Sequence, residues 1–194
     1  HINTQYVLNA IPPEKDVDVL SEKTQGAFFV GRSAILPPAV ETVKIIFSAI
    51  GGSALGGEGA FNLEGKNCAV FGYGLLVGKP VSHWLASQGA TVSIINEFTS
   101  NPTELSHQAD IIISGVGKPN LITADMVKEG VVVIDFGYNI LPEAGSDKPE
   151  AMIVGDVDFN EVSQKAGWIT PVPGGVGPIV IAAVLKNLLA LYKK

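Results

Sequence analysis

The sequence has little of what several classes of protein require. Its single cysteine, Cys68, excludes an internal disulfide and fits a reducing compartment such as the cytoplasm. No apolar run approaches the ~18 residues of a membrane span, and residues 1–10 lack the basic and apolar regions of a signal peptide. The net charge of −6 argues against nucleic acid as the main partner. The three histidines have no spacing that builds a metal site.

What is present favours an α/β protein. The 194 residues, 46% of them hydrophobic, suit one domain, or one domain with a fragment of another. The 22 glycines are many for this length. Glycine-rich α/β enzymes have this composition because βα turns and ligand-binding loops use residues without a Cβ.

Short apolar runs alternate with helical patterns through the middle of the chain. We expect strands at residues 67–71, 91–95, 110–114 and 131–135, and helices at 77–88, 101–108 and 123–128, the last with Thr123 as its N-cap. These repeats predict a parallel sheet covered by helices on both faces. Outside them we expect a helix at 37–50, a glycine-rich linker at 51–59, a surface loop at 141–150 and an apolar helix at 179–192.

A glycine-rich loop follows the first of these strands. Gly72, Gly74 and Gly78 form the pattern G-x-G-x-x-x-G, one residue longer than the commonest dinucleotide-binding fingerprint. Gly72 permits the tight turn, Gly74 permits close approach of a pyrophosphate, and the following helix offers free N–H groups. The alternative is a tight βα turn that binds nothing.

Glu97 lies just past the second strand, about 20 residues after the loop, where an acidic side chain can accept hydrogen bonds from a ribose 2′-hydroxyl. The same charge would repel a 2′-phosphate. The alternative is a solvated surface glutamate.

Six motifs together resemble a known family. They are VLNAIPPEKDVD (7–18), GYGLLVGKP (72–80), DIIISGVGKP (110–119), VVVIDFGYN (131–139), VGDVDF (154–159) and ITPVPGGVGP (169–178). Their order and spacing resemble bifunctional methylenetetrahydrofolate dehydrogenase/methenyltetrahydrofolate cyclohydrolase of the FolD type over nearly the whole chain. TPVPGGVGP carries most of the specificity.

The resemblance implies a fold and a division of the chain. It implies a Rossmann-like NAD(P)-binding domain at 52–172 and a fragment of a folate-binding catalytic α/β domain at 1–36. It also implies a connecting helix at 37–51, and at 173–194 a folate-cleft loop with a helix that returns to the catalytic domain. Members of the family are usually homodimers through the nucleotide domain.

The resemblance also implies site residues. For folate they are Asp18, Gly174, Gly175, Val176 and Pro178. Asp18 would hold the pterin ring, whose N–H groups a carboxylate accepts well. For the coenzyme they are Gly72, Tyr73, Gly74, Val77, Gly78, Glu97 and Tyr138, the last on the nicotinamide side.

Several positions depart from the family pattern. Tyr73 replaces a frequent arginine, and Gly74 and Glu97 replace serines. These changes remove groups that serve a 2′-phosphate, so NAD is favoured over NADP. Three further departures remove polar groups from the expected folate cleft: residues 34–37 replace Pro-Cys-Thr-Pro, the DVDG motif becomes DVDV at 16–19, and Val180 replaces a threonine.

No catalytic residue is expected in this chain, because the family's Tyr-x-x-x-Lys motif would lie upstream of His1, and HINTQ resembles the middle of the catalytic domain. The implied reactions are oxidation of 5,10-methylenetetrahydrofolate with a nicotinamide and hydrolysis of methenyltetrahydrofolate to 10-formyltetrahydrofolate. The chain alone is expected to be inactive. The alternative is a non-catalytic NAD-binding or dimerising module.

Two remaining side chains have chemistry of their own. Cys68 lies inside a predicted strand and is interpreted as a small buried residue rather than a nucleophile. Asp135 ends a strand at the edge where ligands gather in α/β sheets, and a ligand contact and a loop-stabilising role are equally open.

Overall fold

A computed structural model describes residues 2–51, 61–142 and 151–192. Its main feature is a parallel sheet of five strands in the order β2-β1-β3-β4-β7. The strands are β1 (Asn67–Phe71), β2 (Thr91–Ile95), β3 (Ile111–Ser114), β4 (Val132–Asp135) and β7 (Trp168–Ile169). The four strands expected from the sequence are confirmed to within one residue, and the predicted parallel α/β fold is confirmed with them.

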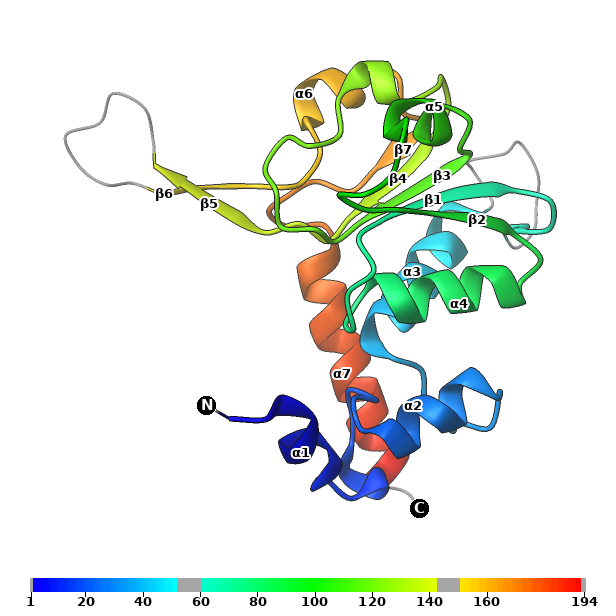
Figure 1. The fold of residues 1–194 in the computed structure, drawn as a ribbon, viewed down its shortest axis with the longest axis vertical. Helices are drawn as coiled ribbons and strands as arrows, with labels where there is room; N and C mark the ends of the chain where they lie inside the picture. Colours follow the sequence, from blue (N-terminus) through cyan, green and yellow to red (C-terminus); the bar gives the residue numbers. More distant parts are fainter. Residues whose placement is uncertain (1, 52–60, 143–150, 193–194) are drawn as a thin grey trace.

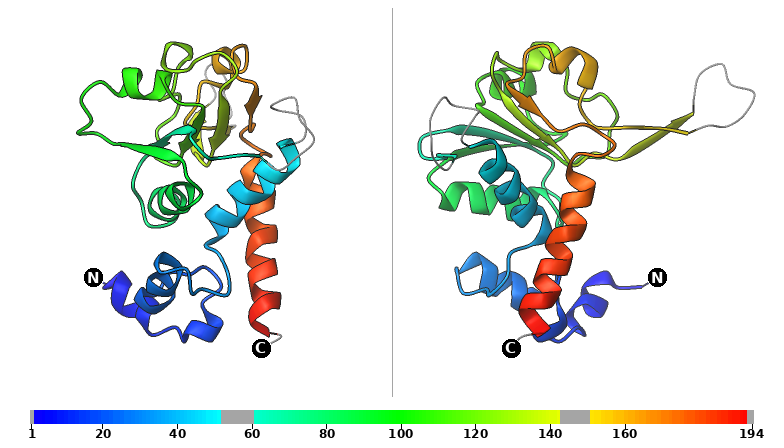
Figure 2. Two further views of the ribbon diagram at one scale, coloured as in Figure 1. Left: turned by 90° about the vertical axis from the view of Figure 1, so that its right-hand side faces the viewer. Right: turned by 180° about the vertical axis from the view of Figure 1, so that it is seen from behind.

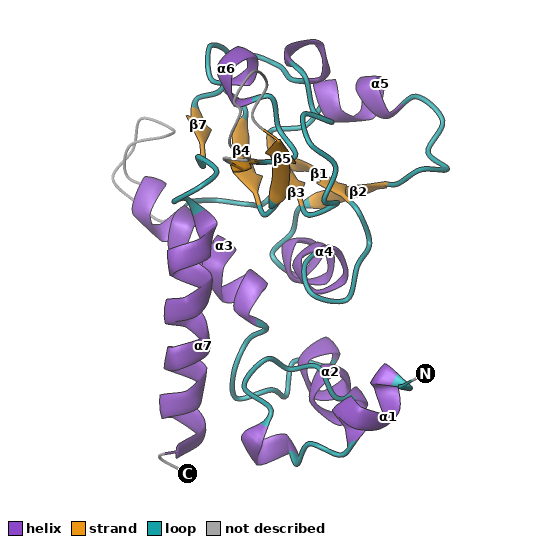
Figure 3. Cartoon of the chain, turned by 90° about the vertical axis from the view of Figure 1, so that its left-hand side faces the viewer, coloured by secondary structure: helices purple, strands orange, loops and turns teal. Residues whose placement is uncertain are grey.

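Helices cover both faces of the sheet (Figures 1 and 3). On one face lie α3 (Pro38–Ile50) and α4 (Gly78–Ser87), and on the other lie α5 (Pro102–His107) and α6 (Phe159–Val162). Successive strand residues point to opposite faces. Accordingly, Val70 and Ile113 join the core cluster beneath α3 and α4, whereas Phe71 and Ile112 join the opposite cluster. This double burial explains why the strands are continuous apolar runs.

Two expectations about local structure need correction. The region 123–128 forms only a 3-10 turn, η2 (Ala124–Met126), because Val127 is already extended and fully buried. Thr123 does not cap this turn with its side chain, since its hydroxyl donates to Asp125 Oδ1 at 2.5 Å instead. Within the expected loop 141–150, residues 141 and 142 belong to a strand. Residues 143–150, and nearly all of the expected linker 51–59, lie outside the described residues.

A two-stranded antiparallel ribbon extends from the sheet after β4 (Figure 1). It consists of β5 (Asn139–Pro142) and β6 (Ala151–Val154), with Ile140 opposite Ile153. Neither strand was predicted from the sequence.

The two ends of the chain lie together, away from the sheet (Figure 2). The N-terminal part consists of α1 (Thr4–Asn9), η1 (Pro13–Lys15) and α2 (Glu22–Phe29), which lie near the far end of α7 (Val176–Tyr192). Helix α7 also packs along α3. Among the described residues, no helix is long and apolar enough to cross a membrane.

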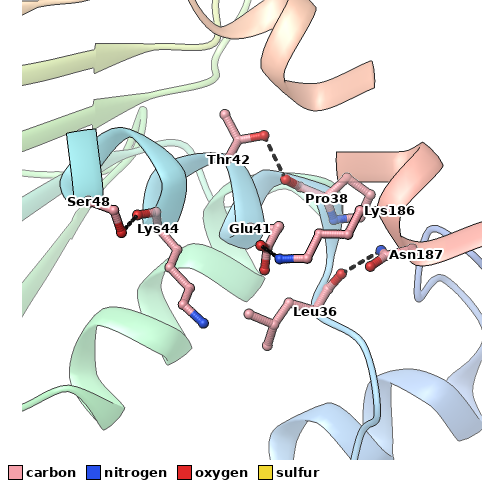
Figure 4. Close-up of polar contacts among 8 residues, drawn as sticks. All are labelled: Leu36, Pro38, Glu41, Thr42, Lys44, Ser48, Lys186 and Asn187. Carbon is pink, nitrogen blue, oxygen red and sulfur yellow. Dashed lines mark hydrogen bonds and ion pairs between the residues drawn. The ribbon is translucent and has the colours of Figure 1, made fainter. Parts of the chain in front are cut away.

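Polar contacts join α7 to α3 and to the backbone before it, and Figure 4 shows those to Leu36 and Glu41. The Nδ2 group of Asn187 donates to the carbonyl oxygens of Val17 and Leu36, at 2.8 Å each. The adjacent Lys186 forms an ion pair with Glu41, whose side chain is buried in α3. These contacts hold segments about 150 residues apart in the sequence.

Candidate functional site

The carboxyl edge of the sheet contains a cavity at the point where the strand order reverses. Strand β1 lies between β2 and β3, so the chain leaves β1 towards one side and returns to the other. Ligands of open α/β sheets bind at such a point. Here a cavity of about 410 Å³ is lined from the loops after β1, β2 and β3, with Gly72, Glu97, Val116 and Lys118 among its walls.

The glycines of the loop after β1 have distinct structural roles. Gly72 has a φ of +88°, which favours glycine. A Cβ added at Gly78 would lie 2.2 Å from the carbonyl oxygen of Gly72, so only glycine lets α4 begin this close to the loop. At Gly74, by contrast, no heavy atom lies within 4 Å of an added Cβ. The backbone there faces open space, which leaves room for a ligand.

Glu97 is exposed in a short turn after β2 and lines the same cavity as Lys118. The turn is held locally, because the N–H of Asn96 donates to Thr99 Oγ1 at 2.9 Å and the N–H of Phe98 donates to Asn96 Oδ1 at 3.0 Å. The cavity therefore presents one carboxylate and one ammonium group. Lys118 was not among the residues singled out from the sequence.

Four of the residues expected near the coenzyme line neither this cavity nor a second one on the other side of the loop, namely Tyr73, Gly74, Gly78 and Tyr138. Tyr73 is 49% exposed and Tyr138 is 62% exposed. The Lys79 Nζ atom lies 5.6 Å from the centroid of the Tyr73 ring, within cation–π range. Val77 lies on the other side of the loop, in the second cavity.

The second cavity, of about 430 Å³, lies between the N-terminal segment and the same glycine-rich loop. Asp18, Gln25 and Phe28 line it from the N-terminal side. Loop residues 75–77 and residues 79–80 of α4 line it from the other side, and residues 37–39, Phe136 and Val180 complete the wall. A single loop thus borders both cavities.

Asp18 is placed in this cavity by a turn that folds around Asp16. The buried Asp16 carboxylate accepts hydrogen bonds from the N–H of Ser21 at 2.8 Å and the hydroxyl of Thr24 at 2.5 Å. Burial alone would raise the pKa of Asp16, but these hydrogen bonds outweigh burial, and its pKa lies below the ordinary value. Desolvation and the neighbouring Asp16 charge raise the pKa of Asp18.

The turn contains a strained residue. Val19 has a φ of +58° and is 2% exposed. A β-branched residue in the left-handed region is a genuine outlier. Val19 stands where the DVDG motif of the family has glycine. Its backbone has the left-handed conformation that glycine adopts readily.

Comparison with known proteins identifies the family. Residues 48–194 match the model described as tetrahydrofolate dehydrogenase/cyclohydrolase, NAD(P)-binding domain. The chain belongs to this family. It is 42% identical to the bifunctional protein FolD of Hydrogenobaculum sp., with 100% of this chain and 64% of the relative covered.

Solved structures of the tetrahydrofolate dehydrogenase/cyclohydrolase family agree with the fold. The FolD enzyme of Campylobacter jejuni is 37% identical with a TM-score of 0.86, covering 100% of this chain and 64% of that one. The Trypanosoma brucei enzyme, in complex with NADP and an inhibitor, is 32% identical with a TM-score of 0.88, covering 100% and 63%. The chain therefore spans less than two thirds of the length of these relatives.

The loop before α7 and the first turn of that helix carry four of the five folate-binding residues expected from the family resemblance. Gly174 has a φ of +101° beside a cis Val172–Pro173 peptide, and a Cβ at Gly175 would lie 2.4 Å from the carbonyl oxygen of Pro171. Val176 is buried at the start of α7. None of the four, Gly174, Gly175, Val176 and Pro178, lines either cavity, so Asp18 is the one expected folate residue that lines the second cavity.

Asp135 and Cys68 are both buried in the family's nucleotide-binding sheet. Asp135 is 2% exposed and accepts from the N–H groups of Gly137 at 2.7 Å and Val157 at 3.0 Å, which supports the loop-stabilising interpretation. Burial raises the pKa of Asp135 to about 6, with a smaller contribution from the charge of Asp156. Burial likewise raises the pKa of Cys68 to about 12, and its interpretation as a small buried residue is confirmed.

Proposed function

We propose that this chain is the nucleotide-binding part, with one wall of the folate cleft, of a methylenetetrahydrofolate dehydrogenase/cyclohydrolase. The reactions are oxidation of 5,10-methylenetetrahydrofolate with a nicotinamide dinucleotide and hydrolysis of methenyltetrahydrofolate to 10-formyltetrahydrofolate. The single observation that carries the proposal is that one glycine-rich loop borders both cavities. A dinucleotide in one and a folate in the other would meet across this loop.

The coenzyme would occupy the cavity at the carboxyl edge of the sheet. Gly72 supplies the turn and lines this cavity, and Gly74 faces open space. In the first turn of α4, the N–H of Lys79 donates to the carbonyl oxygen of Gly74 and Pro80 has no N–H, so the N–H of Gly78 is the group in this turn that can meet a pyrophosphate. The NADP complex of the Trypanosoma brucei relative supports a nicotinamide dinucleotide in general.

Within that class, NAD is favoured over NADP. Glu97 is exposed in the cavity wall and can accept from a ribose 2′-hydroxyl, whereas its charge opposes a 2′-phosphate. Lys118 in the same cavity attracts phosphate, so the preference depends on which of the two charges lies nearer the ribose. Glu97 is the group that can be tested directly.

The folate would occupy the second cavity, with Asp18 as the acceptor for its ring N–H groups. Asp18 is exposed at the cavity wall, so its carboxylate is accessible to accept a charge-assisted hydrogen bond from a ligand. Apolar walls at Phe28 and Leu76 suit a flat ring.

We further propose the division of the chain expected from the resemblance: 1–36 and 173–194 belong to a folate domain, 37–51 connects, and 52–172 binds the nucleotide. The exposed apolar face of α7 supports a domain that continues beyond these residues, because Leu185, Leu188 and Leu189 are each more than half exposed.

Homodimerisation through the nucleotide domain is supported by the ribbon, where Ile140 and Met152 are also more than half exposed. The single cysteine supports a cytoplasmic location.

The coenzyme preference is tested by calorimetric titration of the chain with NAD and NADP. NAD should bind more tightly, and Glu97→Ser should narrow the difference by about tenfold, equivalent to about 1.4 kcal/mol. Glu129→Ser, which removes an exposed glutamate outside the cavity, is the matched control and should leave the ratio unchanged. Tighter binding of NADP by the unaltered chain would contradict the preference, and no binding of either would contradict the proposed function.

A second assay separates the enzyme part from the alternative, a non-catalytic dinucleotide-binding or dimerising module. The chain alone should not hydrolyse methenyltetrahydrofolate, since no proton-transfer group with the family's catalytic motif lies within it. Folate binding near Asp18 should nevertheless be detectable and should weaken in Asp18→Asn. A module that only binds dinucleotide would show no folate binding. Measurable hydrolysis would contradict the proposed inactivity.

A further inference from the structure

One buried carboxylate lies between the loops that form the two cavities. Asp156 follows β6 and is fully buried. Its Oδ2 atom accepts from Ser114 Oγ at 2.8 Å and from the N–H groups of Val116 at 2.7 Å and Gly117 at 3.2 Å. Its Oδ1 atom accepts from the N–H of Lys118 at 3.0 Å and from Asn139 Nδ2 at 3.1 Å.

These hydrogen bonds replace a counter-ion. Across the described residues, no lysine, arginine or histidine forms an ion pair with Asp156. Instead, three successive N–H groups, at residues 116–118, converge on the carboxylate, with Gly117 at a φ of +74°. Successive N–H groups in this arrangement form an anion-binding nest. The nest is filled by a side chain of the protein, so the loop after β3 has no free N–H groups there for a phosphate.

The loop that Asp156 holds is a wall of the dinucleotide cavity. Val116 and Lys118 both line that cavity. A Cβ at Gly72 would lie 3.3 Å from Val116 Cγ2, so the position of Val116 also limits the turn after β1. A shift of the loop after β3 would therefore change the shape of the cavity on two sides.

The same carboxylate faces the segment that leaves β4. Asn139, at the start of β5, donates to it, and a Cβ at Gly137 would lie 2.4 Å from its carboxyl carbon. Phe136, one residue earlier, lines the second cavity. The charged groups facing Asp156 include the buried Asp135 carboxylate, whose Oδ2 accepts from the N–H of the next residue, Val157.

We propose that Asp156 is a positioning residue for coenzyme binding, which fixes the loops at 115–118 and 136–139 without contacting the coenzyme. The inference rests on the proposed function, because it assigns the first cavity to a dinucleotide. All five of its partners donate to it, so both carboxylate oxygens act as acceptors. An amide at this position would direct an NH₂ group at N–H donors and would release part of the nest.

The test is calorimetric titration of NAD into the unaltered chain, Asp156→Asn and the control Leu85→Ala. Leu85 is fully buried beneath the sheet and lines neither cavity, so its truncation destabilises the protein without altering the loops. We expect NAD to bind about tenfold or more weakly to Asp156→Asn. Leu85→Ala should lower the melting temperature and leave the dissociation constant within about twofold.

A spectroscopic measurement adds a readout that general destabilisation does not move. The amide proton resonances of residues 116–118 should shift together in Asp156→Asn and remain in place in Leu85→Ala. Should Asp156→Asn not fold, the Ser114→Ala/Asn139→Ala double variant takes its place. It removes two donors and keeps the nest, so NAD affinity should fall about threefold to tenfold relative to Leu85→Ala.

The outcomes distinguish this inference from the function on which it rests. If the unaltered chain binds no dinucleotide, the proposed function is contradicted, and this inference with it. If the unaltered chain binds NAD and the folded Asp156→Asn variant binds it equally well, only the positioning role is overturned. Equal affinity of the double variant and Leu85→Ala overturns the role in the same way.

Discussion

The two cavities beside the glycine-rich loop are built by different means. The first lies at the ends of three hydrogen-bonded parallel strands, and its walls are the loops that follow them. The second is assembled from the turn at 18–20 with α2, the start of α3, the segment at 75–80, the residue after β4 and α7, which come from five separate parts of the chain. The first therefore takes its shape from sheet register, and the second depends on contacts between distant segments.

Each cavity nevertheless has one wall held by a buried carboxylate, Asp156 for the first cavity and Asp16 for the second. Asp156 accepts N–H groups from the loop after β3, and Asp16 accepts those of Leu20 and Ser21 in the turn that presents Asp18. The turn around Asp16 places Val19 in a left-handed conformation, whereas the loop around Asp156 has Gly117 at its positive φ. The wall of the second cavity is thus the more strained of the two.

The first cavity should be disrupted most by Gly78→Ala. Because the new Cβ would lie 2.2 Å from the Gly72 carbonyl oxygen, α4 or the loop must move. We expect the free energy of unfolding to fall by about 3 kcal/mol, measured by urea denaturation. NAD affinity should fall with it, measured by calorimetric titration.

Gly74→Ala is the matched control in the same loop. No atom lies within 4 Å of its added Cβ, and its φ is not positive, so stability should change by less than about 1 kcal/mol. If a pyrophosphate approaches this backbone closely, NAD affinity should still fall. An unaltered stability in Gly78→Ala would contradict the packing role assigned to the third glycine.

The contrast between the cavities also explains what the sequence could predict. The strands around the first cavity are apolar runs bounded by turn residues, and each was located to within one residue. Their order along the chain, with a glycine loop after the first, was enough to locate Gly72 and Glu97 in one cavity. Periodicity and turn chemistry are local signals, and this region is built from local units.

The second cavity was predictable only through family resemblance. That resemblance selected Asp18, but no local pattern brings it together with Leu76 or Val180. The β5–β6 ribbon was missed because its strands have four residues each and β5 contains a proline, which is uncommon in strands. The role proposed for Asp156 depends on donors about 40 residues earlier in the chain, and no spacing rule connects them.

The contacts that support the second cavity should be weakened by Asn187→Ala. This change removes both hydrogen bonds from α7 and leaves the carbonyl groups of Val17 and Leu36 without that donor. We expect the free energy of unfolding to fall by about 2 kcal/mol, measured by urea denaturation. Amide hydrogen exchange should quicken first in the segment 17–36, because Asn187 joins α7 to both of its ends.

Leu188→Ala serves as the control on the neighbouring position, since Leu188 is 52% exposed. It should change the free energy of unfolding by no more than about 0.5 kcal/mol. Equal losses in the two variants would mean that helix propensity, and not the two hydrogen bonds, determines the effect.

Acid should affect the stabilising contributions of Asp135 and Asp16 in opposite directions. Burial raises the pKa of Asp135 to about 6 from 3.8, so the folded state disfavours its ionised form. This cost is fully present above about pH 6 and disappears as the pH falls towards 4. Acidification from pH 7.5 to 5 should therefore stabilise the protein by about 1 kcal/mol. The raised pKa of Asp18 acts in the same direction. Asp16, with its lowered pKa, instead loses stabilisation only as the pH falls below its unfolded value of 3.8.

The smallest predicted effect is therefore the change in the free energy of unfolding with pH that comes from Asp135. Urea denaturation at pH 7.5 and 5.0 should show the unaltered chain gaining stability on acidification relative to Asp135→Asn, which cannot titrate at this position. The variant retains an oxygen that can accept from Gly137 or Val157, so it should fold. Identical slopes in the two proteins would show that Asp135 does not titrate in this range. The cost of its burial would then have to be offset by the N–H groups at the end of the sheet, as it is at Asp16.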